Sequence, residues 1–91
     1  MTGARAYANK VIRMRKHLIR IGKSRQNSMQ TINALQEIER WLNFYPKAND
    51  SQVARFLAKH KGQMYTLIPG MTCPAAGKLI TELNQLTQSY E

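Results

Sequence analysis

The side chains best suited to do chemistry in this chain are cationic, and they are concentrated at its start. Eight of the fourteen Lys and Arg residues fall within residues 1–25, and the first acidic residue is Glu37. Residues 26–91 carry six basic and five acidic groups, so the first 25 residues hold nearly all of the net charge of +9. Such a cluster repels itself and attracts a polyanion. A nucleic acid backbone is the commonest polyanion, and an anionic membrane surface is the next.

The residues needed for catalysis are scarce. General acid and base chemistry needs titratable groups placed close together, whereas five carboxylates and two histidines are scattered along this chain. Cys73 is a lone thiol, and with His17 and His60 it does not make a four-ligand zinc set. Residues 22–24 (Gly-Lys-Ser) end like a phosphate-binding P-loop, but the position that this motif reserves for its first glycine is His17. We therefore expect no enzyme activity, no catalytic residues, no metal and no cofactor.

An amphipathic N-terminal helix must carry the basic cluster. From Ala4 to Ile21, apolar side chains recur at a 4-3-4-3 spacing, which keeps them on one side of a helix. This apolar seam comprises Tyr7, Val11, Met14, Leu18 and Ile21. At 100° per residue, most of the cations lie on the opposite face. The residues that we predict to contact nucleic acid from this segment are Arg5, Arg13, Lys16, Arg20, Lys23 and Arg25.

The rest of the chain predicts three further helices. Apolar residues from Leu35 to Tyr45 repeat at a 3-4-3 spacing, and Pro46 ends that helix because proline cannot continue the backbone hydrogen bonds. A third helix opens after three successive candidate N-caps at residues 49–51, and Pro74 suits the first turn of a last helix. The predicted helices span residues 4–21, 29–44, 52–60 and 73–86.

Residues 63–71 are the part of the chain that the pattern does not decide. A short strand, a helical turn and an ordered loop all fit so brief an apolar run. The sequence thus predicts an all-α fold, a small four-helix domain with at most one short strand near residues 65–68. Within that single domain, residues 1–25 form the basic amphipathic helix and residues 26–91 a trihelical body.

Aromatic side chains near the end of the second helix allow two interpretations. Trp41, Phe44 and Tyr45 could stack on single-stranded bases, but they fall within the apolar periodicity of their helix. We therefore predict that they pack in the core, and we keep Tyr65 as a possible contact. His60 is expected to interact with the last carbonyl groups of the third helix.

The helix order in the body resembles a known family. A long helix, a short Ser-Gln-Val-Ala-Arg-Phe-Leu helix and a Pro-Ala-Ala-Gly-Lys-Leu-Ile-Thr-Glu-Leu helix are similar to the trihelical core of helix-turn-helix DNA-binding domains, winged-helix ones in particular. The resemblance spans residues 29–88, although residues 60–71 replace the family's turn of three or four residues. It implies that the last helix enters the major groove. The residues implied to lie near base edges are Thr72, Lys78, Thr81 and Gln85, and those near phosphates are Arg55, Lys59 and Lys61.

Two functions of different classes fit these features. The first is a small basic nucleic-acid-binding protein, with duplex DNA favoured, acting as a DNA-binding regulator of transcription or an accessory factor. The second is a helical protein interaction module, an adaptor or inhibitor of a larger nucleic-acid-processing complex, that uses the apolar seam to bind a partner or form a homodimer. Membrane-surface association through the same helix is a third interpretation, and a merely solvated basic face is a fourth.

Three features of the sequence bear on the cellular location of the protein. No apolar run reaches the roughly 18 residues of a membrane span, and a single cysteine suits a reducing, cytoplasmic setting. The Arg-rich, acid-free N-terminus also has the character of a mitochondrial presequence. Because its pattern continues into the predicted folded body, we expect a cytoplasmic protein.

Overall fold

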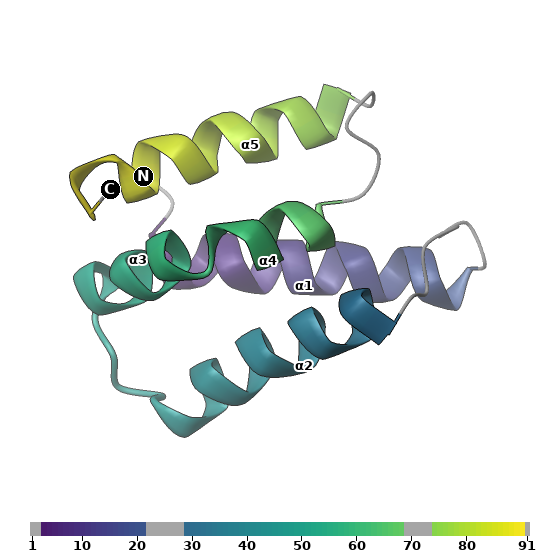
Figure 1. The fold of residues 1–91 in the computed structure, drawn as a ribbon, viewed down its shortest axis with the longest axis horizontal. Coiled ribbons are helices and arrows are strands. Elements are labelled where there is room, and N and C mark those ends of the chain that lie inside the picture. Colours follow the sequence, from purple (N-terminus) through teal and green to yellow (C-terminus); the bar gives the residue numbers. More distant parts are fainter. Residues whose placement is uncertain (1–2, 22–28, 69–73, 91) are drawn as a thin grey trace.

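The computed structural model describes residues 3–21, 29–68 and 74–90, and no strand occurs among them. Two helices, α3 and α4, run nearly in line and pack along α1, while α2 and α5 lie on opposite sides of them (Figure 1). This arrangement confirms the predicted all-α fold. The elements are α1 (Ala4–Arg20), α2 (Met29–Phe44), α3 (Asp50–Lys59), α4 (Lys61–Leu67), α5 (Pro74–Thr87) and the short 3-10 helix η1 (Gln88–Tyr90).

The core is shared by all five α-helices, and α1 is part of it. The predicted seam places Tyr7 and Val11 in full burial, with Ala4, Ala8 and Ile12 beside them. The Tyr7 hydroxyl donates a 2.9 Å hydrogen bond to the Leu79 carbonyl oxygen of α5. Helix α1 is therefore packed against the other helices as part of the core. The core residues of the other helices include Ile38, Leu42, Val53, Leu57, Met64, Leu67, Leu79 and Leu83.

A short connection between α2 and α3 fixes the angle at which those helices meet. Pro46 follows the last turn of α2, and the Ala48 amide donates to the Tyr45 carbonyl oxygen at 3.2 Å. Of the three candidate caps, Asn49 is the one used. Its Oδ1 accepts from the Gln52 amide at 2.9 Å, and the Gln52 side chain accepts from the Asn49 amide at 2.9 Å. This reciprocal capping box starts α3 two residues earlier than predicted.

The undecided stretch forms a fifth helix, so the helical alternative is the one observed and the predicted number of four helices is wrong. Helix α4 follows α3 after a single residue, His60, which also ends α3 before its predicted limit. Met64, Leu67 and Ile68 are buried at i, i+3 and i+4, the spacing of one helix face. Helix α4 packs against α2 and α1. A run this short contains too few repeats for its period to be recognised from sequence.

The other predicted boundaries agree closely with the structure. Helices α1 and α2 match the predicted spans to within one residue at each end, and α5 differs by one residue at each end. Residues 22–24, which end like a P-loop, lie outside the described residues, as do Thr72 and Cys73. In the described part of the chain, no helix has the length and apolar character needed to cross a membrane.

Candidate functional site

Two of the cations on α1 are held by carboxylates from other helices. The Lys10 ammonium lies 3.1 Å from the Glu82 carboxylate of α5, and Lys16 lies 2.8 Å from the Glu39 carboxylate of α2. Lys16 was predicted to contact phosphate. Both pairs are partly exposed, so a phosphate could compete for either lysine. In the described structure, however, they lower the charge that α1 presents.

Arg5, another predicted phosphate contact, is directed at the protein's own backbone. Its guanidinium donates to the carbonyl oxygens of Leu42 at 3.3 Å, Tyr45 at 2.6 Å and Ala48 at 3.4 Å. Leu42 lies in the last turn of α2, where carbonyls lack partners within the helix and carry the negative end of its dipole, and Tyr45 and Ala48 follow in the connection to α3. A guanidinium with five N–H donors suits several of them at once. Arg5 therefore ties the start of α1 to the end of α2.

The remaining α1 cations divide by burial. Arg15 is 3% exposed, and this burial lowers the pKa of its guanidinium. Arg13 and Arg20 are exposed, as predicted for residues that meet a polyanion. Lys23 and Arg25 lie outside the described residues. Of the predicted α1 contacts that the structure describes, Arg13 and Arg20 are thus the ones presented to solvent without a carboxylate or carbonyl partner.

The predicted base-edge residues of α5 share one exposed face. Lys78, Thr81 and Gln85 border a shallow hollow together with Glu82. The Thr81 hydroxyl donates to the Gly77 carbonyl oxygen at 3.0 Å. Thr72, the fourth predicted member, lies outside the described residues. The three residues therefore share an exposed face, on which the single lysine lies beside the carboxylate of Glu82.

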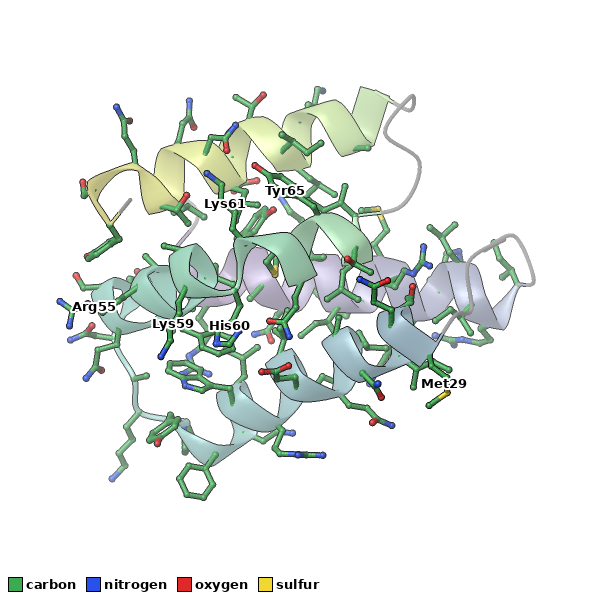
Figure 2. The ribbon with its side chains drawn as sticks, viewed as in Figure 1. Met29, Arg55, Lys59, His60, Lys61 and Tyr65 are labelled. Atoms are coloured by element: carbon green, nitrogen blue, oxygen red, sulfur yellow. The ribbon has the colours of Figure 1, made fainter. Side chains whose placement is uncertain are left out.

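Of the predicted phosphate contacts on α3 and α4, Arg55 and Lys59 lie beside aromatic side chains. Arg55 and Lys59 are exposed on α3, and Lys61 is half-buried at the start of α4. The Arg55 guanidinium also lies 5.8 Å from the centre of the Tyr90 ring. Figure 2 shows the side chains of Lys59 and His60, at the end of α3, on the side that faces α2.

The prediction that Trp41, Phe44 and Tyr45 pack in the core is wrong for two of the three. Phe44 is 73% exposed and Tyr45 is 48% exposed, while Trp41 is half-buried against the core. Phe44 follows Leu42 by two residues, which is about 200° around a helix and so on the opposite side from the core. That angle was the available signal. Tyr45 lies beyond the last turn of α2, where the core no longer covers it.

The five rings of this region make one continuous series of contacts. The rings of Phe44 and Tyr45 meet edge to face with their centres 4.8 Å apart, and the ring centres of Tyr45 and Trp41 are 5.0 Å apart. Trp41 stacks on Phe56 of α3 at 4.3 Å with 12° between the planes, and Phe56 lies 4.5 Å from His60. These distances are those of favourable aromatic pairs. The series leads from a ring in solvent to rings packed on the core.

An open groove of about 780 Å³ runs along this series, between the end of α2 and α3. We call it the aromatic groove. Its rings are those of Trp41, Phe44, Tyr45, Phe56 and His60. Lys47, Arg55 and Lys59 also line it, and no Asp or Glu is among its lining residues in the described chain. Volumes of about 300–1,000 Å³ are usual for sites that bind small ligands.

His60 lines the inner end of the groove, and two polar side chains contact its ring. Its Nδ1 lies 2.6 Å from the Gln63 Oε1 and 3.7 Å from the Glu37 carboxylate, and the Gln63 amide donates to Glu37. The His60 ring therefore contacts Gln63 and Glu37, and the prediction that it interacts with the last carbonyl groups of α3 is wrong. No group of three potential metal ligands occurs in the described part of the chain.

The apolar seam is mostly used inside the chain. Tyr7 and Val11 are buried, Met14 and Leu18 are half-buried, and Ile21 is exposed. Burial raises the pKa of the Tyr7 phenol well above its usual range, with the nearby Glu82 and Tyr65 adding to the shift. A partner could therefore reach only the second half of the seam without unfolding the core.

Comparison with known proteins gives no relative for this arrangement. The chain matches no model of a protein family, no curated protein sequence and no solved structure.

Proposed function

We propose that this protein binds nucleic acid, with cationic side chains on α1 and α3 contacting phosphates. The observation that carries the proposal is the excess of charge: fourteen Lys and Arg residues stand against five Asp and Glu. Lys10 and Lys16 are held in ion pairs with the carboxylates of Glu82 and Glu39. Arg13, Arg20, Arg55 and Lys59 remain exposed. A surface of this kind binds a polyanion by releasing its condensed counterions.

A salt titration tests the proposal directly. Fluorescence anisotropy with labelled DNA should show affinity falling with salt at a log-log slope of about −3 to −5, as expected for four to six neutralised phosphates. Arg13→Ala and Arg20→Ala should each make the slope shallower by about 0.7 to 0.9 if their side chains contact phosphate. Asn9→Ala is the matched control, because Asn9 is an exposed neutral residue on the same helix. A wild-type slope shallower than about −2 contradicts the proposal.

The helix-turn-helix form of the proposal uses α5 to read duplex DNA. The shared exposed face of Lys78, Thr81 and Gln85 supports it, since a recognition helix needs polar side chains directed outward together. In this form the protein is a DNA-binding regulator or accessory factor. Because α4 lies between α3 and α5 in the chain, α5 is the second helix after α3, not the first. Lys78→Ala and Gln85→Ala should then change which duplex sequences are preferred.

A second candidate function is protein interaction through the open half of the seam. Ile21 is exposed, and Met14 and Leu18, which precede it in the seam, are half-buried. A second copy of the chain is the partner that this surface would bind in a homodimer. Light scattering of the wild type and of Ile21→Ser tests it. If both proteins have the mass of a monomer, the homodimer hypothesis is contradicted.

A further inference from the structure

Two aromatic side chains are presented to solvent at the edge of a groove that three cationic side chains also line. Phe44 and Tyr45 belong to the large apolar side chains that the described chain leaves exposed. Covering an aromatic ring is favourable, and a contiguous exposed apolar patch commonly marks a binding surface. These rings continue into the core through Trp41 and Phe56, so they extend a packed structure.

The charge around the rings specifies what could cover them. Lys47 follows the rings in the chain, and Arg55 and Lys59 line the groove from α3. In the part of the chain that the structure describes, none of these three cations is held in an ion pair with a carboxylate. A ligand that fits must therefore combine flat apolar surfaces with negative charges at its edges.

We propose that the aromatic groove binds unpaired bases of a single-stranded nucleic acid, stacked on Phe44 and Tyr45, with Lys47, Arg55 and Lys59 contacting the phosphates on either side. This inference rests on the proposed function and narrows it from nucleic acid in general to strands with open bases. Sites that bind single strands without sequence preference combine a positively charged groove with aromatic stacking surfaces in this way.

The rings favour a single strand over a duplex for a geometric reason. In a duplex, the faces of the bases are stacked on each other and only edges and phosphates are accessible. An exposed phenyl ring such as Phe44 has no hydrogen-bonding group with which to contact either. In a single strand the base faces are available, and stacking tolerates any base because each has a flat π surface.

The groove is held in place before any ligand binds. Arg5 fixes the Tyr45 carbonyl oxygen at 2.6 Å, Pro46 restricts the backbone that follows, and the Trp41–Phe56 stack joins α2 to α3. A preformed site avoids part of the entropic cost of ordering side chains on binding. His60 at the inner end is likewise fixed by Gln63 and Glu37.

The test compares single and double strands on the full chain. A labelled oligonucleotide of about 12 nucleotides and the matching duplex are titrated by fluorescence anisotropy, and Trp41 fluorescence is recorded at the same time. Because Trp41 is the single tryptophan, a base stacked in the groove should change its emission. We expect the single strand to bind more tightly and to quench Trp41. Phe44→Ala and Tyr45→Ala should each weaken single-strand binding about 5- to 100-fold and leave duplex binding within about twofold.

Met29→Ala is the matched control for Phe44→Ala. Met29 is 68% exposed and lies on the same helix at its opposite end (Figure 2), so its removal should leave both affinities unchanged. Phe44 is so exposed that its variant is expected to fold, which circular dichroism can check.

The possible results separate the inference from the function on which it rests. If both strand forms bind and Phe44→Ala and Tyr45→Ala weaken neither, the groove inference is overturned while nucleic acid binding stands. If neither form binds at low salt, both are overturned. A copolymer of glutamate and tyrosine is the third ligand. If the copolymer quenches Trp41 and the single strand does not, the groove binds acidic aromatic peptides and not bases.

Discussion

The Arg5 guanidinium of α1 donates a 2.6 Å hydrogen bond to the carbonyl oxygen of Tyr45, forty residues further along the chain. A side chain whose type and position indicate phosphate binding is thus used to hold the residue that forms one wall of the aromatic groove. Further hydrogen bonds from Arg5 reach the carbonyl oxygens of Leu42 and Ala48. The start of the chain therefore contributes to this surface by fixing its backbone.

Replacing Arg5 with alanine should destabilise the protein by about 1–2 kcal/mol, because three carbonyl oxygens lose a charged donor. The carbonyls are partly exposed, so water can replace some of what is lost. Urea unfolding followed by Trp41 fluorescence measures the change. Arg13→Ala removes the same charge from an exposed position of α1 and should stay within about 0.5 kcal/mol. Equal effects of the two variants would mean that charge, and not the contact to α2, matters.

Tyr7→Phe should cost about 1–2 kcal/mol at neutral pH, since the buried hydroxyl donates to the Leu79 carbonyl oxygen. Burial raises the pKa of Tyr7 in the folded state, while the unfolded chain has the ordinary value near 10. Raising the pH above about 10 therefore ionises Tyr7 mainly in the unfolded chain and favours unfolding. The stability difference between wild type and Tyr7→Phe should be constant below about pH 9 and should shrink above about pH 10. A difference that does not change with alkaline pH contradicts the burial of this hydroxyl.

Gly62→Ala should stabilise the protein by about 0.5–1 kcal/mol if residues 61–67 are helical. A Cβ added at Gly62 meets no atom within 4 Å, so the gain in helix propensity is not offset by a clash. Gly77→Ala provides the comparison, because Gly77 lies in α5 and has the same open space. Thermal unfolding of both variants measures the shift. A loss of stability for Gly62→Ala alone would show that this stretch is not the helix described as α4.

Glu39→Gln should raise the affinity for nucleic acid, because it releases Lys16 from a 2.8 Å ion pair. If the freed lysine then contacts phosphate, the log-log salt slope should become steeper by about 0.7 to 0.9. Stability should change by less than about 1 kcal/mol, as is usual for a partly exposed pair. Glu37→Gln removes the same charge without releasing a lysine, since Glu37 contacts Gln63 and His60. An identical slope for the two variants would argue against a role for Lys16.

The amino-acid sequence alone determined the all-helical class and the spans of the longest helices. In α1, α2 and α5 the apolar residues repeat often enough to define a period of 3.6, and Pro46 and Asn49 mark where the chain must turn. The concentration of positive charge in the first 25 residues is likewise a property of the sequence. Helix α4 was not determined in this way, because seven residues fit a strand as well as a helix.

The tertiary structure decided which side chains remain available to a ligand. Helical periodicity gives the angle of a residue about its own helix, but it does not say which group from another helix lies opposite. The ion pairs of Lys10 with Glu82 of α5 and of Lys16 with Glu39 of α2 therefore could not be predicted from the sequence. Phe44 and Tyr45 looked buried because they end an apolar pattern, yet the core stops one turn earlier. The aromatic groove exists because α3 packs beside the end of α2, a contact between segments that no local pattern specifies.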